Sequence, residues 1–251
     1  MSGHSKWSTI KRKKGAIDAV RGKLFTKLGK EIIVDARMGG GDPDANPRLR
    51  TAVDAAKAQS MPKDNIERAI KRGTGELKGD NIEELVYEGY GPAGVAVMVE
   101  TATDNKNRTV ADLRKLFKSS GGSLAENGAV GYLFTRLGQL TFDASKHTEE
   151  QVMEIAMEAG AQDISESDGI VTVLTDPTEI YKVKEAFDKV GMHSETAGFS
   201  FVPSTMIPID GENAEKVLKL MDGLDDHDDV QHVHANFDID EKVLAELAEE
   251  S

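Results

Sequence analysis

The sequence contains no cysteine, so the chain can form no disulfide, no thiolate zinc site and no cysteine nucleophile. It also lacks a run of about 18 apolar residues, the length that a helix needs to cross a bilayer. Its first residues, MSGHSKW, are polar and basic, unlike the hydrophobic region of a signal peptide. These absences argue against secreted, membrane and thiol-dependent classes, and we expect a soluble, cytoplasmic globular protein.

Catalytic and cofactor motifs are missing as well. There is no GxSxG nucleophile elbow, and no hydroxyl has a His and an acid at a recognisable spacing. The segment Gly15–Leu24 looks at first like a phosphate loop, but six residues separate its glycines and Leu24 stands where Ser or Thr would hold magnesium. The GGGDP run at 39–43 has no GxGxxG frame after a strand. We therefore expect a non-enzymatic protein without a cofactor.

Charge is distributed very unevenly. The net charge of −13 averages a part with 18 Lys or Arg and 9 Asp or Glu, residues 1–78, with a part that has 13 and 35, residues 79–251. Such asymmetry predicts that the N-terminal part meets a polyanion while the remainder is repelled by phosphate. The same charges could instead fold the basic part back onto the acidic body, a self-masking alternative.

The most basic segment is 3–30, with nine Lys or Arg and a single acid, Asp18. Lysine and arginine displace counterions from phosphates, and the indole of Trp7, the one tryptophan, can stack on a base or sugar. The alternative is a solvated basic helix face with Trp7 anchored in a small core. We favour nucleic-acid binding.

Residues 1–78 read as a helical bundle. From residue 16 onward, apolar residues at helical spacing (Val20, Leu24, Leu28, Ile32) predict an amphipathic helix, or two helices that meet near Gly22. The GGGDP run should end it, and Asn46 followed by Pro47 should begin the next. A further helix is expected over 62–72, and the glycine-rich segment 73–80 reads as a linker.

Beyond residue 80 the hydrophobic period becomes that of strands. Strands are expected at 85–87, 94–101 and 129–135, with a helix over 109–119. The polar loop before that helix should be capped by Asn107 or Asp104. Lys106 and Arg108 there would form an anion pocket at a helix N-terminus, or simply belong to a polar loop.

Residues 138–203 alternate as βαββαβ, the ferredoxin-like pattern. After them we expect a strand (206–209), a helix (214–221), a strand (230–236) and a final helix from residue 240. The units at 85–135 and after 203 are each too small to bury a sheet alone, so we expect them to pair. The predicted fold is α+β: a helical bundle (1–78), a discontinuous α+β domain (79–137 and 204–251) and an inserted ferredoxin-like domain (138–203).

A cluster of acids and histidines lies near the C-terminus. Residues 225–229 read DDHDD, and His232 and His234 would point to one face of a strand. Two imidazoles near carboxylates could hold a divalent metal in a hydrolase. We prefer a solvated acidic turn, because no third ligand or outer shell can be identified, and we expect no metal site.

Several segments together resemble the YebC family. They are GHSKW, RGKLFTKL, GGGDPDANPRLR, MPKDNIERAIKRG, YEGYGPAGVAVMVE, and TDNKNRT followed by SSGGSLAENGAVGYLF, and the resemblance extends along the whole chain. It implies a helical N-terminal domain with two α+β domains, one inserted in the other. It also implies a probable DNA-binding transcriptional regulator, with mitochondrial relatives that activate translation of cytochrome c oxidase and a suggested role at the ribosome on difficult stretches such as consecutive prolines.

We therefore predict a monomeric, non-enzymatic, nucleic-acid-binding regulator of gene expression, with DNA or with ribosomal or transfer RNA as partner. No recognition helix can be identified, since 47–59 offers only Arg48, Arg50 and Gln59 for reading bases. A ribosome-associated translation factor, a metal-dependent hydrolase and a protein scaffold are the alternatives. The candidate nucleic-acid-binding residues are His4, Ser5, Lys6, Trp7, Lys11, Arg12, Lys13, Lys14, Arg21, Lys23, Lys27, Lys106 and Arg108.

Overall fold

The computed structural model describes residues 19–79, 81–167, 169–240 and 243. Three helices come first, α2 (Ala19–Gly39), α3 (Pro47–Ala58) and α4 (Lys63–Gly73). The sequence left open whether two helices meet near Gly22, and α2 runs through this residue without a break. Asn46 caps α3 as predicted, because its side chain accepts a hydrogen bond from the N–H of Leu49. One apolar cluster joins the three helices.

The first sheet contains strands from both ends of the acidic part of the chain. Its order is β3-β1-β2-β9, antiparallel throughout. The predicted pairing of the segment after residue 203 with the segment before residue 135 is thereby confirmed. The four strands are β1 (Glu83–Tyr90), β2 (Ala96–Thr103), β3 (Ser123–Leu124) and β9 (Val230–Ala235).

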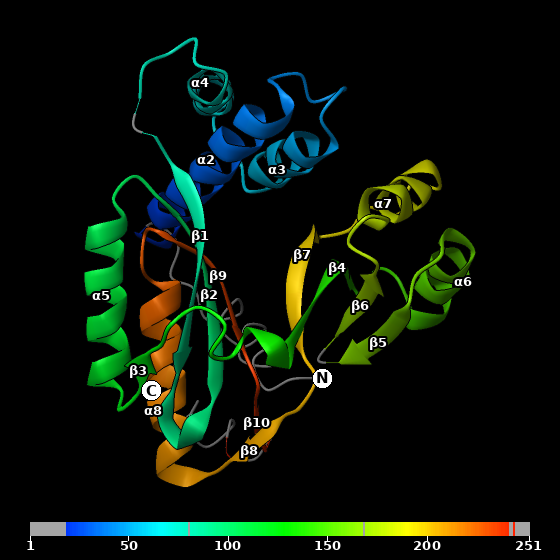
Figure 1. The fold of residues 1–251 in the computed structure, drawn as a ribbon. Coiled ribbons are helices and arrows are strands. Elements are labelled where there is room, and N and C mark those ends of the chain that lie inside the picture. The colour runs from blue at the N-terminus through cyan, green and yellow to red at the C-terminus, as the bar shows by residue number, and fades with distance from the viewer. Residues whose placement is uncertain (1–18, 80, 168, 241–242, 244–251) are drawn as a thin grey trace.

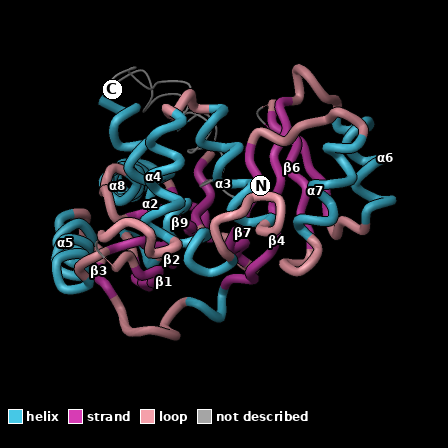
Figure 2. Tube along the Cα trace, turned by 90° about the horizontal axis from the view of Figure 1, so that it is seen from above, coloured by secondary structure: helices cyan, strands magenta, loops and turns pink. Residues whose placement is uncertain are grey.

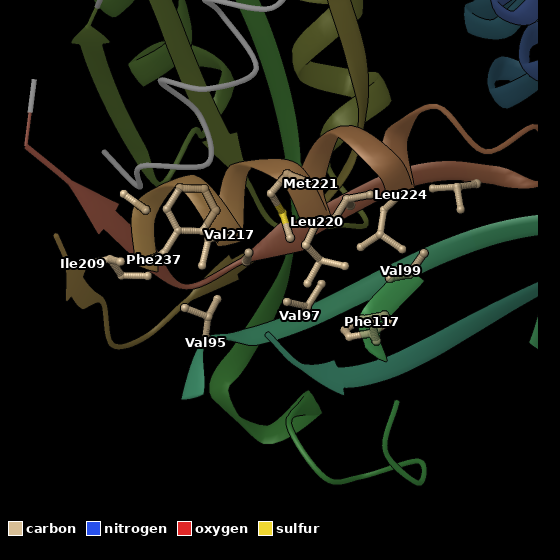
Figure 3. Close-up of a cluster of buried hydrophobic side chains, with 14 of the residues drawn as sticks. Val95, Val97, Val99, Phe117, Ile209, Val217, Leu220, Met221, Leu224 and Phe237 are labelled. Atoms are coloured by element: carbon tan, nitrogen blue, oxygen red, sulfur yellow. The ribbon is translucent and has the colours of Figure 1, made fainter. Parts of the chain in front are cut away.

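Two helices, α5 (Lys106–Ser119) and α8 (Gly211–Asp225), cover one face of this sheet (Figure 1). Val97 and Val99 of β2, with Val95 just before the strand, point toward them and meet Phe117 and Leu220 in a closed apolar core (Figure 3). The strand expected at 206–209 is present as β8 (Ile207–Ile209), and it extends this core by pairing in parallel with β10 (Phe237–Ile239), a strand that was not predicted. The final helix expected from residue 240 falls almost entirely outside the described residues.

The second sheet has the order β5-β6-β4-β7, with every neighbour antiparallel. This is the strand order of a ferredoxin-like βαββαβ unit, as the sequence predicted. Two helices pack on one face, and in Figures 1 and 2 they lie at the opposite end of the molecule from α5. The elements are β4 (Phe134–Asp143), α6 (Glu149–Ala159), β5 (Asp163–Ser167), β6 (Ile170–Thr175), α7 (Ile180–Lys189) and β7 (Thr196–Pro203).

The strand predicted at 129–135 is wrong. Residues 131–133 form a short 3₁₀ turn, η2 (Gly131–Leu133), and the strand begins only at Phe134. The buried carboxylate of Glu88 explains the loop, because it accepts hydrogen bonds from the N–H groups of Gly128, Val130 and Gly131, each at 2.7 Å. The predicted boundary between residues 137 and 138 therefore falls inside β4. The division into domains stays a prediction.

Candidate nucleic-acid interface

The lysines of α2 share one side of the helix. Leu28 and Ile32 are buried against α3 and α4, while Lys23, Lys27 and Lys30 recur at spacings of four and three residues and so project together. Each of them reaches the acidic turn 225–229. The Nζ of Lys27 lies 2.6 Å from the carbonyl oxygen of Asp225 and 3.5 Å from its carboxylate. Lys23 contacts Asp226 in the same way, at 3.2 and 3.7 Å.

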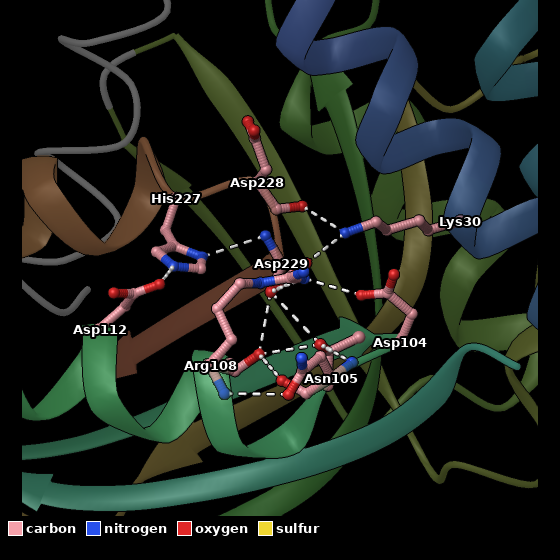
Figure 4. A network of polar contacts seen from close by, with 10 residues as sticks. Lys30, Asp104, Asn105, Arg108, Asp112, His227, Asp228 and Asp229 are labelled. Atoms are coloured by element: carbon pink, nitrogen blue, oxygen red, sulfur yellow. Dashed lines mark hydrogen bonds and ion pairs between the residues drawn. The ribbon is translucent and has the colours of Figure 1, made fainter. Parts of the chain in front are cut away.

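Asp229 is the centre of this contact (Figure 4). Its side chain is 3% exposed and accepts from the Nζ of Lys30 at 2.6 Å, from an Nη of Arg108 at 2.9 Å and from the hydroxyl of Thr109 at 2.9 Å. Burial alone would raise the pKa of Asp229, but these hydrogen bonds outweigh it and hold the pKa well below its usual range. The carboxylate is thus charged at neutral pH and links α2 to α5.

The loop before α5 is built for this contact. The sequence pointed to Asn107 or Asp104 as the cap, but the structure has Asn105, whose side chain accepts from the N–H of Arg108 at 3.1 Å. The helix consequently begins at Lys106, three residues earlier than predicted. Asp104 instead pairs with Arg108 at 2.7 Å.

Each predicted binding residue whose side chain the structure describes contacts a carboxylate. Besides Lys23 and Lys27, Lys106 lies 2.6 Å from Glu83, and Arg108 touches Asp104 and Asp229. The anion pocket expected around Lys106 and Arg108 therefore already holds carboxylates of the chain itself. The other predicted residues lie outside the described part, or have side chains that do: His4, Ser5, Lys6, Trp7, Lys11, Arg12, Lys13, Lys14 and Arg21.

A groove of about 950 Å³ runs between α2, α4 and the 225–229 turn. Groups of both signs line it, so a phosphate backbone entering the groove would meet guanidinium groups of α4 as well as aspartates. An incoming phosphate must take the place of an aspartate at each lysine of α2. The positively charged residues of its lining are Lys23, Lys30, Arg68, Arg72 and Arg108, and the negatively charged ones are Asp104, Asp112, Asp226, Asp228 and Asp229.

The metal site considered for the histidines does not assemble in the described residues. His234 is buried and places Nε2 2.7 Å from a carboxylate oxygen of Glu100, and its ring lies 6.4 Å from that of His232. Burial lowers the pKa of His234, and the contact with Glu100 offsets this only in part. Of the two carboxylates considered as ligands, Asp228 and Asp229, the latter is engaged by Lys30, Arg108 and Thr109. No group of three potential ligands forms within the described chain.

The second sheet does not provide a stacking platform. On many ferredoxin-like domains, RNA bases stack on aromatic side chains of the open sheet face. Residues of β4 that alternate away from the helices are Leu137, Gln139 and Thr141, and their neighbours on β7 include Gly198 and Ser200. This face carries neither an aromatic nor a basic side chain on those strands.

Sequence reasoning missed a set of basic residues on the helices of the first sheet. Arg114, Lys115, Lys118 and Lys219 are exposed, and their side chains form no ion pair in the described structure. The signal was present in the run 113–125, which holds three cations and no acid inside an otherwise acidic part of the chain.

In the described residues, no helix combines the length and apolar character that crossing a membrane requires.

Two family descriptions match the chain: "TACO1/YebC protein N-terminal domain" over residues 5–76 and "TACO1/YebC second and third domain" over residues 82–237. Among similar proteins is one named "Probable transcriptional regulatory protein" from Treponema denticola, 57% identical over 96% of this chain and 98% of its own length. Another with that name, from Geobacter sp. (strain M21), is 53% identical over 98% of this chain and all of its own length.

A crystal structure of a conserved hypothetical protein from Aquifex aeolicus has the same fold. It superposes with a TM-score of 0.87 at 49% identity and covers 91% of this chain and 95% of the other. The helical N-terminal part, the two sheets and the relatives that match from end to end agree with one another. This chain belongs to the TACO1/YebC family.

Proposed function

We propose that this protein is a non-enzymatic, nucleic-acid-binding regulator of gene expression. The observation that carries the proposal is the excess of positive charge in residues 1–78 beside a strongly acidic remainder. The relatives' name, probable transcriptional regulatory protein, supports the same class of function.

In this proposal the cations of the first 30 residues neutralise phosphates, Trp7 stacks on a base or sugar, and His4 and Ser5 add polar contacts. The ion pair between Lys30 and Asp229 fixes α2 to the body of the protein. Lys23 and Lys27 contact phosphate only by exchanging their aspartate partners.

Binding through the backbone rather than through bases is favoured by the environment of Arg48. Of the three residues on α3 and its cap that could read bases, Arg48 is held by Asp35 and by Glu84, the latter at 2.6 Å. Only Arg50 and Gln59 stay available, fewer than a recognition helix uses. This supports a ribosomal or other structured RNA as an alternative to duplex DNA.

Fluorescence anisotropy with a labelled 20-base-pair DNA duplex and a labelled 20-nucleotide RNA tests the proposal. If about six cations contact phosphates, the logarithm of affinity should fall against the logarithm of salt concentration with a slope of about −4 to −5. Neutralising Lys11, Arg12, Lys13 and Lys14 together should make the slope clearly shallower. Binding that does not respond to salt, or no binding to either probe, refutes the proposal.

The cellular target is tested by ribosome profiling with and without the protein. Pausing at defined codons would identify a translation factor, whereas changes confined to the transcript levels of certain genes would identify a transcriptional regulator. An unchanged profile and unchanged transcripts would contradict both forms of the proposal.

A further inference from the structure

The cations of the acidic part of the chain fall into two groups. In the described residues from 81 onward, most Lys and Arg side chains form ion pairs with nearby carboxylates, and Arg136 rests on the ring of Phe199 at 4.2 Å. The remaining four, Arg114, Lys115, Lys118 and Lys219, form no ion pair with any residue that the structure describes. The paired ones are Lys106, Arg108, Lys146, Lys182, Lys184, Lys189 and Lys216.

The four unpaired cations lie on α5 and α8, the two helices that cover the first sheet. Leu113 and Phe117 turn inward to the core of the first sheet, so Arg114 and Lys118 project outward one helical turn apart, about 6 Å along the axis of α5. α8 packs beside α5, with Leu116 against Gly223, and contributes Lys219 to the same side. Figure 1 shows the two helices side by side on the outer surface.

A hollow of about 690 Å³ lies where this cationic face ends. It is formed between the end of α5, the turn η1 (Pro92–Gly94) and the first turns of α8. Lys118, Lys216 and Lys219 meet there beside Ser119 and Ser120, and two carboxylates, Glu212 and Glu215, line the same hollow; Lys216 pairs with Glu212 at 2.7 Å. The two lysines that form no ion pair in the described structure, Lys118 and Lys219, are the donors that the hollow offers to a phosphate group.

The character of the surface favours a nucleic acid over a protein partner. Protein interfaces have a buried apolar centre, and no large apolar side chain is exposed on α5 or α8. The exposed ones in the described chain lie on other elements: Met38, Leu77, Val86, Tyr90, Tyr132, Met153, Met157 and Val190. Unpaired cations grouped within one helical turn instead suit the closely spaced negative charges of a phosphodiester chain.

We propose that the outer face of α5 and α8, defined by Arg114, Lys115, Lys118 and Lys219, is a second nucleic-acid contact surface. It takes the backbone of the same molecule that the basic N-terminal segment binds, and so rests on the proposed function. Arg108 borders the groove beside α2, and Arg114 follows about 9 Å further along α5. The groove and this face thus lie along the same helix, which a single strand can follow.

The test compares two full-length triple variants that remove the same net charge. The first is Arg114→Gln/Lys115→Gln/Lys118→Gln. The matched control is Lys146→Gln/Lys182→Gln/Lys189→Gln, which neutralises exposed lysines already paired with Glu195, Glu179 and Glu185. Both are assayed with the 20-nucleotide RNA and the DNA duplex over a range of salt concentrations, and circular dichroism checks that each variant is folded.

If each of the three cations contacts one phosphate, the salt slope of the first variant should become shallower by about 2 to 3. Its affinity for RNA at 0.1 M salt should fall on the order of 100-fold. The control should keep the wild-type slope, and poly-L-glutamate at equal charge concentration should compete poorly.

The experiment distinguishes a failure of the proposed function from a failure of this inference alone. Wild-type protein that binds neither probe overturns the proposed function and this inference together. Wild-type binding with the same slope in both triple variants overturns this inference alone. Poly-L-glutamate that competes as well as RNA, with competition lost in the first variant, would assign the face to an acidic protein and likewise overturn it.

Discussion

Replacing Asp229 by asparagine should destabilise the protein more than any other change in the 225–229 turn. The carboxylate is buried at the junction of α2, α5 and β9, and it balances the charge of Lys30, whose side chain is only 15% exposed. An asparagine of the same shape keeps the packing but removes the negative charge. The substitution therefore isolates the electrostatic part of the contact.

The expected loss follows from the three donors. Lys30 loses its charged acceptor and keeps only the carbonyl oxygen of Asp228, at 2.9 Å. Arg108 is about half exposed and keeps Asp104, so its share is discounted for solvent screening. Thr109 retains an acceptor in Asn105. A charge-assisted hydrogen bond to a buried lysine contributes about 1.5–3 kcal/mol, so we expect a total loss of about 2–4 kcal/mol.

Urea denaturation followed by circular dichroism at pH 7 measures this loss. The control is Asp228→Asn, because the adjacent side chain is exposed and forms no ion pair in the described structure, and its effect should stay within about 0.5 kcal/mol. In a double-mutant cycle, Lys30→Met with Asp229→Asn should show coupling well above 0.5 kcal/mol.

Acid should remove the difference in unfolding free energy between the wild-type protein and Asp229→Asn. The pKa of Asp229 is lowered in the folded protein, so its stabilisation is fully present above the unfolded pKa near 4 and is lost as the pH falls toward the folded value. The two unfolding curves should therefore converge below about pH 4. Equal stability of Asp229→Asn and Asp228→Asn at pH 7 would refute the reasoning.

Three further changes test other parts of the structure. Burial raises the pKa of Asp35 to about 7, even though the Arg48 guanidinium lowers it, so the free energy of unfolding should fall as the pH rises from about 4 to 7. Asp35→Asn should flatten that fall in urea titrations. An unchanged slope would contradict this. Glu88→Ala leaves three backbone N–H groups without their acceptor and should lower the free energy of unfolding, measured by thermal unfolding, by about 2–4 kcal/mol. A loss under about 1 kcal/mol would show that water replaces the carboxylate. Gly138→Ala places a Cβ 2.3 Å from the hydroxyl of Thr175 and should lower the free energy of unfolding by about 1–3 kcal/mol. Gly198→Ala, with open space around its Cβ, is the control. Similar melting temperatures of the two variants would contradict the close packing at Gly138.

Much of the fold follows from sequence periodicity. The helical spacing of Leu28 and Ile32, the Asn46–Pro47 start signal and the βαββαβ order of residues 138–203 each predicted what the structure has. The pairing of the two separated halves of the first sheet also followed, because neither half could bury a sheet by itself. These are properties that a short stretch of chain, or a count of strands, determines.

Contacts between distant segments were beyond the reach of the same reasoning. The strand expected at 129–135 looked apolar enough, but Glu88, some 40 residues earlier, folds the loop around its carboxylate. The candidate site met the same limit. Charge counts marked Lys23 and Lys27 as cations, but nothing local showed that residues about 200 positions later supply their partners. The described lysines of α2 pair with carboxylates of the acidic part, as the self-masking alternative predicts for them.

The connection between the two sheets has a consequence for how the gene could change. Leu133 and Ser204 flank the βαββαβ unit, and the N–H and hydroxyl of Ser204 both donate to the carbonyl oxygen of Leu133, at 2.8 and 3.0 Å. The chain thus leaves the first sheet and returns to it at one point, with ends that a tight turn could join. Units whose ends meet in this way are the ones that a host tolerates as insertions. The second sheet could accordingly be exchanged for another unit at this point, provided that the new unit covers Ala96 and Met98 of β2 as Phe134 and Phe201 do.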